Sequence, residues 1–302
     1  MAVAVETIKP RAGQSFRLLS WDRSIERVRL HTEAGQSIPV DGSGSLWHRH
    51  SEMEITCVTE GHGLRLIGNH LEKFTAGDLI IIDRHLPHYW RMDGASHGYC
   101  IQFDPEAPLS VWQSGEEIAA TLQPLRRAAR LGLHITGNTA AEIQSRLSKL
   151  ATLAALPRFT ALLDILTIAS QAPPHDTQTL ASKDFHLPEP GDPHERAIAA
   201  AVAMISGHFH EPLKLSDILD AVPVSRPTFS RHFKRSTGRS FITFLTEIRI
   251  ANACRELTTS QKSVTQIAED SGFNDLSHFN RMFRRQMNCS PLAYRRGSHQ
   301  FR

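Results

Sequence analysis

The feature that most constrains this fold is a block of residues that occurs twice near the C-terminus, 50 residues apart. Residues 229–235 read Phe-Ser-Arg-His-Phe-Lys-Arg, and residues 279–285 read Phe-Asn-Arg-Met-Phe-Arg-Arg. On a helix, two phenylalanines four residues apart share one face and can anchor the helix in a small core. The arginine between them and the basic pair after them then point outward. Two such helices in one domain indicate a protein that contacts two successive stretches of DNA groove.

Length and charge indicate two domains. At 302 residues the chain can bury two separate cores. Residues 193–302 carry 16 Lys and Arg against 9 Asp and Glu, a net of +7, whereas residues 1–192 carry 18 against 22, a net of −4. A basic domain beside a mildly acidic one favours polyanion binding by one half of the chain, although a basic charge alone also fits a domain that is merely soluble.

Cysteine spacing and hydropathy predict a cytoplasmic protein without a membrane partner. Cys57, Cys100, Cys254 and Cys289 are far apart and form no Cys-x-x-Cys pair, which argues against a zinc module or a disulfide framework. No run of residues approaches the ~18 apolar residues of a membrane span, and the first residues lack the pattern of a signal peptide.

Helix signals divide residues 192–302 into two similar halves. Asp192 and Ser225 are expected N-caps, and Gly238 is an expected C-cap. A short helix from Ser216 followed by the helix with the first block has helix-turn-helix geometry, in which the second helix enters the major groove. A joining helix over about residues 241–257 follows, and residues 263–270 and 275–287 repeat the pattern. At ~1.5 Å per residue the joining helix spans about 25 Å, enough to hold two recognition helices about one DNA turn apart.

Residues 194–296 resemble the double helix-turn-helix domain of the AraC/XylS family of bacterial transcription regulators. Pro223 stands where the family has Gly in the first turn, and Asn288 replaces Gly at the second C-cap. The matching residues are Phe229-x-Arg231-x-Phe233-Lys234-Arg235-x-x-Gly238, Ile267-Ala268-x-x-x-Gly272-Phe273, Phe279-x-Arg281-x-Phe283 and Ser290-Pro291-x-x-Tyr294-Arg295.

The resemblance implies DNA contacts on both recognition helices. Base edges are expected to meet Ser230 and Arg231 on the first helix, with Pro227 and Thr228 as further candidates, and Ser277, His278 and Arg281 on the second. Arg226 is expected to contact DNA as well. Helical spacing independently places residues 277, 278 and 281 on one face. Phosphates are expected to meet Lys234, Arg235, Arg284 and Arg285. For any single basic residue, plain solvent exposure is the alternative.

The N-terminal half reads as short strands separated by glycine turns, which is typical of a β-barrel or sandwich. Strands are expected over residues 53–59, 64–67, 70–74, 78–83 and 97–103. His48, His50 and Glu54 share strand parity, so their side chains can point into one interior, and His88 lies on a later strand that can face them.

This pattern resembles the cupin fold. The first cupin motif is matched in full by Gly42-x5-His48-x-His50-x3-Glu54-x6-Gly61, but in the second, Gly77-x10-His88, Asp83, His85 and Met92 replace the usual Pro, Gly and Asn. Three histidines and a glutamate can hold a divalent transition metal, and they can equally line a pocket that hydrogen-bonds a polar ligand or water. Trp90 shares parity with His88, so it either offers a stacking face to a sugar ring or simply packs in the core.

Helices are expected over residues 116–131, 138–152 and 157–170, with Asn138 capping the second. Their leucine-rich stripes can pair with a second copy of the chain, as such helices do in the family, or can pack only on their own barrel. Residues 172–191 are rich in proline and are expected to form the interdomain linker.

Together these observations predict an α+β protein of two domains. Residues 1–113 form a cupin-like sensing barrel, residues 114–171 a helical dimerisation segment, residues 172–191 a linker, and residues 192–302 an all-α double helix-turn-helix domain. The expected function is a homodimeric, non-enzymatic transcription regulator, an activator that engages RNA polymerase, in the bacterial cytoplasm at the nucleoid. It would bind promoter DNA and a small polar effector such as a sugar. The alternatives are a metal-dependent cupin isomerase or dioxygenase that also binds DNA, and a nucleoid protein without sequence preference.

Overall fold

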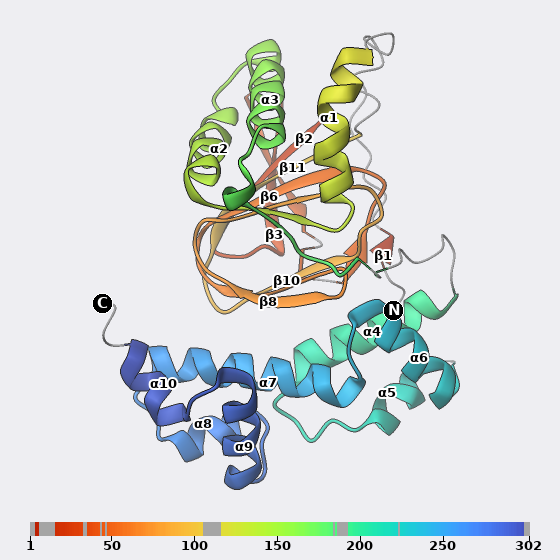
Figure 1. Ribbon diagram of the computed structural model, residues 1–302, viewed down its shortest axis with the longest axis vertical. Helices are drawn as coiled ribbons and strands as arrows, with labels where there is room; N and C mark the ends of the chain where they lie inside the picture. Colours follow the sequence, from red (N-terminus) through yellow and green to blue (C-terminus); the bar gives the residue numbers. More distant parts are fainter. Residues whose placement is uncertain are drawn as a thin grey trace. The chain divides into compact units, whose positions relative to one another are not determined.

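The computed structural model describes residues 4–5, 16–32, 35–42, 44–45, 47–104, 116–183, 185, 193–222 and 224–298. The chain divides into two compact units, residues 4–187 and residues 188–302. The first contains the strands and the second is built from helices, which agrees with the predicted α+β class (Figure 1). No described helix is both long and apolar enough to cross a lipid bilayer.

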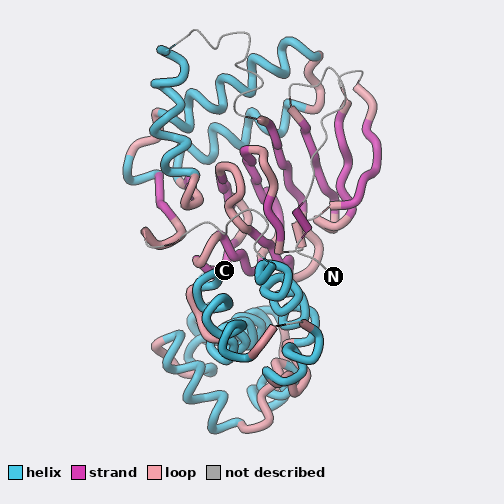
Figure 2. The backbone as a smooth tube through the Cα atoms, turned by 90° about the vertical axis from the view of Figure 1, so that its right-hand side faces the viewer, coloured by secondary structure: helices cyan, strands magenta, loops and turns pink. Residues whose placement is uncertain are grey.

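Two sheets form the barrel of the first unit (Figures 1 and 2). One has the strand order β13-β12-β9-β6-β11-β2-β3-β4 and the other β1-β5-β10-β7-β8. The strands that were predicted from glycine turns agree with β6 to β9 and β11 to within a few residues. The bounds are β1 Ala4–Val5, β2 Arg17–Asp22, β3 Arg27–His31, β4 Ser37–Asp41, β5 His48–Arg49, β6 Met53–Glu60, β7 Gly63–Ile67, β8 His70–Phe74, β9 Asp78–Ile82, β10 His88–Met92, β11 His97–Phe103, β12 Leu133–Ile135 and β13 Thr177–Thr179.

Alternation along the strands separates the barrel interior from its outer face. On β9, Ile80 belongs to the inner apolar cluster and Leu79 to the outer one. Residues paired directly across two strands project to the same face. Trp90 of β10 belongs to the inner cluster and pairs with Arg65 of β7, so the Arg65 side chain also starts from the inner face.

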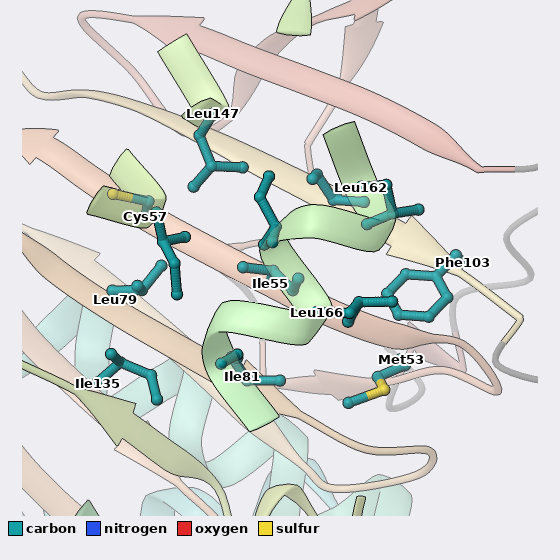
Figure 3. Close-up of a cluster of buried hydrophobic side chains, with 14 of the residues drawn as sticks. Met53, Ile55, Cys57, Leu79, Ile81, Phe103, Ile135, Leu147, Leu162 and Leu166 are labelled. Atoms are coloured by element: carbon teal, nitrogen blue, oxygen red, sulfur yellow. The ribbon is translucent and has the colours of Figure 1, made fainter. Parts of the chain in front are cut away.

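Three helices cover the outer face of the larger sheet: α1 (Glu116–Ala129), α2 (Gly137–Leu150) and α3 (Ala155–Ser170) (Figure 1). Figure 3 shows Leu147 of α2 and Leu166 of α3 among strand residues such as Ile55. Both leucines are at most 5% exposed. These two leucines therefore pack on their own barrel, whereas dimerisation through the segment of residues 114–171 stays a prediction. The sheet's outer face is itself apolar and buries them within one chain.

The predicted linker, residues 172–191, is also corrected over its first part. A 3₁₀ turn, η2 (Pro174–Asp176), leads into β13, which pairs with β12. Leu180 and Phe185 are then buried in the inner cluster. The prolines fix a turn that returns the chain to the sheet, so this stretch belongs to the barrel. Residues 186–192, including the expected N-cap Asp192, lie outside the described residues.

The same turn changes the expected cap of α2. The N-cap is Thr136, whereas Asn138 is exposed inside the helix. The Asp176 carboxylate accepts hydrogen bonds from the backbone N–H of Thr139 (3.1 Å) and from its hydroxyl (2.7 Å). A residue 37 positions away thus caps the helix, and local sequence could not have indicated it.

The described part of the second unit contains two helix-turn-helix cores joined by one helix, α7. Phe233 of α6 packs edge-on against Phe244, with ring centroids 5.5 Å apart. In the other core, Phe279 and Phe283 of α9 pack with residues 250–257 of α7. With 19 residues at ~1.5 Å each, α7 is about 28 Å long. The helices are α4 Pro193–His208, α5 Leu215–Ala221, α6 Arg226–Thr237, α7 Phe241–Thr259, α8 Val264–Asp270, α9 Leu276–Met287 and α10 Pro291–Ser298.

Candidate nucleic-acid interface and barrel cavity

The two phenylalanine pairs fix which face of α6 and α9 points outward. Phe229, Phe233, Phe279 and Phe283 are at most 1% exposed. Gly238 ends α6 with a φ of 72°, a left-handed conformation that glycine adopts freely. Asn288 ends α9 with a φ of 54°, so asparagine fills that role at the second site. The substitution that departs from the family pattern therefore preserves the helix end, while Pro223 lies outside the described residues.

The structure presents most of the candidate DNA-contacting residues on the surface of the second unit. Ten of them are exposed: Arg226, Pro227, Ser230, Arg231, Lys234, Arg235, Ser277, Arg281, Arg284 and Arg285. None of Arg231, Lys234 and Arg284 forms a salt bridge with a described residue, so their charges can be directed at phosphates.

Two candidates, Thr228 and His278, are half-buried. The Ser225 hydroxyl contacts the Thr228 hydroxyl at 3.0 Å, and the His278 ring stands edge-on to Phe273, with centroids 5.8 Å apart. Asp275 caps α9 by accepting from the backbone N–H groups of Ser277 (2.7 Å) and His278 (3.2 Å). The first turn of α9 is therefore held on both sides, which fixes the direction in which its side chains project.

The barrel brings three of the predicted ligand residues into one buried cluster. His48 comes from β5 and His88 from β10, where the two strands pair directly at these residues, and His50 follows β5. One ring nitrogen of each histidine lies within 4.8 Å of the others, and all three are at most 2% exposed. Glu54 of β6 lies beside this trio, with its Oε2 atom 3.0 Å from His50 Nε2 and 3.9 Å from His88 Nε2.

Glu54 has the contacts of a hydrogen-bonded carboxylate. Its Oε1 atom accepts from the Thr56 hydroxyl at 2.6 Å, and its Oε2 atom accepts from the Gln102 amide at 2.8 Å. Burial by itself would raise the pKa of the Glu54 carboxyl, but the hydrogen bond from His50, together with that from Thr56, holds that pKa well below its usual range. The predicted quartet is therefore a histidine trio with an adjoining, already satisfied carboxylate.

His88 has the geometry of a neutral imidazole with one free ligand atom. Its Nδ1–H donates to the Leu86 carbonyl at 2.7 Å, so Nε2 carries the lone pair. Burial, followed by the proximity of His48, lowers the pKa of His88 well below its usual range. Among the described residues His88 Nε2 has no hydrogen-bond partner. A histidine whose second nitrogen is fixed by a backbone carbonyl has the usual arrangement of a metal ligand, so the trio fits a divalent transition metal.

A small cavity adjoins this cluster, with a volume of about 40 Å³. Trp90 lines it, as strand parity predicted, and also packs in the inner core at 1% exposure. Its indole Nε1 is buried without a hydrogen-bond partner in the described part of the chain. Gly42 of the first cupin motif also lines the cavity, and a Cβ there would lie 2.1 Å from the Ile25 carbonyl oxygen, so only glycine fits.

Two polar residues of this cavity were missed by the sequence analysis. Arg17 of β2 donates from a terminal nitrogen to the Gln102 side chain at 3.0 Å, and Gln102 in turn holds Glu54. Neither belongs to a recognisable motif. The sequence offers one signal for Gln102, which is a polar residue between Ile101 and Phe103 in an otherwise apolar stretch of a strand. In the second motif, His85 adopts a φ of 63°, so the position that is glycine in other cupins keeps its left-handed backbone here.

Comparison with known proteins supports both halves of this description. Residues 218–297 match the family described as a helix-turn-helix domain, and residues 35–103 match the cupin domain. The HTH-type transcriptional activator RhaS of Escherichia coli O157:H7 (strain EC4115 / EHEC) is 34% identical over 96 residues, which cover 32% of this chain and 34% of that protein. RhaS of E. coli strain K12 / DH10B gives the same figures. The chain thus matches about a third of the length of these relatives.

Two of the similar solved structures each cover about a third of the chain. The DNA-binding domain of the global transcriptional factor AdpA, in complex with a target DNA, is 34% identical with a TM-score of 0.34, covering 35% of this chain and 96% of that one. A regulator from Chromobacterium violaceum with an AraC-type DNA-binding domain is 31% identical with a TM-score of 0.33, covering 34% and 93%. The chain thus has a cupin domain followed by a helical domain with two helix-turn-helix cores, and it is similar to AraC-type transcription regulators.

Proposed function

We propose that this chain is a cytoplasmic, nucleoid-associated regulator that recognises promoter DNA and activates transcription. The observation that carries the proposal is the repeated arrangement of α6 and α9. Each is anchored by two buried phenylalanines and turns an exposed arginine outward, Arg231 and Arg281. The similarity of the C-terminal domain to transcriptional activators supports the direction of regulation.

In this proposal the exposed residues divide into two groups. Arg231 and Arg281 lie near the middle of their helices and read base edges, where a bidentate arginine discriminates guanine by about 1–3 kcal/mol. Lys234 and Arg284 lie one turn further along and contact phosphates, which position the protein without reading sequence. Because α7 is about 28 Å long, the two helices can enter successive major-groove segments of one DNA face.

The test is a selection of genomic fragments by the full-length protein at physiological salt. We expect a few sites with a shared motif that spans two major-groove segments. Arg281→Ala should relax one of the two segments, whereas the matched control Arg196→Ala, an exposed arginine on α4, should leave the motif unchanged. Uniform recovery of fragments by the unmodified protein, with and without extracts of small metabolites, would contradict specific recognition and favour nucleoid-type binding.

We further propose that the barrel senses a small polar effector. The support is a buried donor, Trp90 Nε1, and a buried acceptor, His88 Nε2, that both lack partners among the described residues. A cavity of about 40 Å³ accommodates an ion or a few water molecules. A sugar needs a site of roughly 300 Å³ or more, so the expected stacking of a sugar on Trp90 does not fit this arrangement of the cavity.

We propose that the histidine trio binds a divalent transition metal. His48, His50 and His88 would be the ligands, and the ion would supply a fixed positive charge and open coordination positions for a polar molecule. Metal analysis of the purified protein tests this. Stoichiometric zinc, iron or manganese that is lost in His48→Ala supports the site, whereas metal-free protein with an unchanged melting temperature on metal addition contradicts it.

We propose that the active form is a homodimer that engages RNA polymerase at the promoter. Because most of the leucine stripe packs on the barrel, we propose that the dimer contact uses side chains that the helices leave exposed, such as Leu156 of α3, which is 71% exposed. Analytical ultracentrifugation of the unmodified protein and of Leu156→Ser tests this. The similarity to a transcriptional activator, RhaS, favours this proposal over the alternative of a metal-dependent cupin enzyme.

A further inference from the structure

A second and larger cavity lies in the first unit, away from the histidine trio. It has a volume of about 470 Å³, within the range of roughly 300–1,000 Å³ of small-molecule sites. Its walls come from β7, β8, the start of β9, β12 and the first two turns of α2. Among the described residues, the two cavities share no lining residue.

A buried arginine forms part of this cavity's wall. The Arg65 side chain is 1% exposed, although it carries a guanidinium group. Its Nε–H is shared between the two oxygens of Asp78, at 3.1 and 3.2 Å. Its NH2 group lies 3.1 Å from Glu72 Oε2 and 3.4 Å from His134 Nδ1. The remaining terminal nitrogen, NH1, is buried without a hydrogen-bond partner in the described part of the chain.

An unpaired guanidinium nitrogen is an unusual feature of a buried site and requires an explanation. NH1 carries two N–H groups and can only donate, so its missing partner is an acceptor oxygen. Two carboxylates, Asp78 and Glu72, already surround Arg65, and Lys73 adds a second positive charge to the lining. The positive and negative charges of the wall therefore balance. A charged occupant would disturb this balance, whereas a neutral molecule with hydroxyl or carbonyl oxygens would not.

The other walls suit a small hydroxylated molecule. Glu72 is 44% exposed at its side chain and can accept from a hydroxyl, while NH1 of Arg65 can donate to one. Phe74, Ala140 and Ala141 supply an apolar surface beside these polar groups. A polyhydroxylated molecule carries alternating hydroxyl and C–H groups, so its binding site needs hydrogen-bond donors and acceptors beside an apolar wall.

We propose that this second cavity is a binding site for an uncharged polyhydroxylated molecule of the sugar or polyol class, with Arg65 NH1 donating to a ligand oxygen. The site does not require that the chain regulates transcription, so its failure would leave the DNA-binding proposal intact. If the regulator does respond to a sugar-sized effector, this cavity has the volume that the histidine cavity lacks.

The test uses ligand-observed saturation-transfer NMR on the full-length protein. The neutral probes are D-ribose, D-glucose and glycerol, and the charged analogues are D-gluconate and D-glucosamine. We expect transfer to at least one neutral probe and little to either charged one. Ala141→Phe fills the cavity from an exposed position of α2 and should abolish the transfer. Ser148→Phe, exposed two turns further along α2 and outside the cavity lining, is the matched control and should retain it.

Two variants test the charge argument and the location. Glu72→Gln removes one negative charge from the wall, so we expect D-gluconate to gain transfer relative to D-glucose. His88→Ala removes one ring of the histidine trio, which does not line this cavity, and should leave the sugar signal unchanged. The proposal is overturned if no neutral probe shows transfer, if D-gluconate is preferred by the unmodified protein, or if His88→Ala abolishes binding while Ala141→Phe does not.

Discussion

Replacing Arg158 with methionine tests whether the helical layer is an integral part of the barrel. Arg158 of α3 is 3% exposed and donates to four backbone carbonyls. Two of them end α2, Leu150 at 3.1 Å and Ala151 at 3.3 Å. The other two belong to His31, the last residue of β3, at 3.2 Å, and to Thr32, which follows it, at 3.0 Å. One side chain thus joins two helices to the barrel, and its positive charge also suits the carbonyl end of a helix.

The size of the effect follows from the carbonyls that would lose their donor. A buried polar group left without a partner costs about 1–3 kcal/mol. Methionine keeps most of the apolar stem, so packing changes little. If water reaches two of the four carbonyls, the remaining two predict a loss of about 2–6 kcal/mol in the free energy of unfolding. Arg146→Met is the matched control, since Arg146 of α2 is 37% exposed at its side chain and pairs with Glu142 at 3.0 Å. An exposed pair of this kind is worth at most about 1 kcal/mol.

Urea unfolding followed by tryptophan fluorescence measures this loss in the first unit alone. All four tryptophans, at positions 21, 47, 90 and 112, lie within residues 4–187. We expect the Arg158→Met midpoint to fall well below that of the unmodified protein and the Arg146→Met midpoint to stay close to it. If the two variants lose the same small amount, the four hydrogen bonds do not hold the layer to the barrel and the helices are a separable module.

Three further outcomes are expected. Arg281→Ala should weaken DNA binding by about 1–3 kcal/mol and relax the base preference at one position of the site. Lys234→Ala should instead weaken binding to all sequences and reduce the slope of log affinity against log salt concentration by about one unit. Fluorescence anisotropy with a panel of base-substituted sites separates the two results. Backbone hydrogen bonds at the start of α9 lower the pKa of Asp275. The ionised Asp275 therefore stabilises the folded helix fully above the ordinary carboxyl pKa of about 4, and this stabilisation is lost as the pH falls through the lowered pKa. Hydrogen-exchange protection of α9 should fall over this acidic pH range, and this pH dependence should be smaller in Asp275→Ala. Iodoacetamide should label the half-buried Cys289 and spare Cys57, because burial raises the pKa of the Cys57 thiol to about 12. Equal labelling of the two cysteines, measured by peptide mass spectrometry, would contradict this expectation.

The C-terminal domain could be predicted almost completely from the sequence because its information is local. Two phenylalanines four residues apart define a buried face, and Gly238 and Asp275 lie at helix ends where their side chains or backbone have specific roles. Each of these signals acts within about one turn of helix. Because the block at residues 229–235 recurs at residues 279–285, the same helix pattern could be assigned twice.

The barrel's strands could be predicted, but its edges could not. Proline-rich residues 172–185 looked like a linker, yet Pro174 begins a turn that returns β13 to the sheet. The cap of α2 by Asp176 and the anchoring of α3 by Arg158 both depend on residues brought together by the folded barrel. Periodicity showed that the leucines of α2 and α3 needed a partner, but it could not distinguish their own sheet from a second chain.

The polar residues of the barrel show the same limit. His48, His50 and His88 could be assigned because two of them form a motif and strand parity directs the third. The lining of the second cavity comes from three separate stretches of the chain, residue 65, residues 72–78 and residues 134–144, and no motif connects them. Arg65 in particular reads as an ordinary exposed residue of a half-polar strand until its pairing with Trp90 places it on the inner face.

The geometry of His50 determines how a metal would have to bind. Its Nδ1 atom lies 3.0 Å from the Glu52 carbonyl oxygen and its Nε2 atom 3.0 Å from Glu54, so both contacts are satisfied together only when each ring nitrogen carries a proton. A metal at Nε2 must displace that proton, because only an unprotonated nitrogen can be a ligand. His88 needs no such exchange, since its Nε2 atom is already free among the described residues. His88 would therefore hold an ion without losing a contact, whereas His50 would lose its hydrogen bond to Glu54, which would keep its Thr56 and Gln102 donors. Metal binding by the proposed trio would therefore be coupled to the charge of the cavity through a single proton on His50.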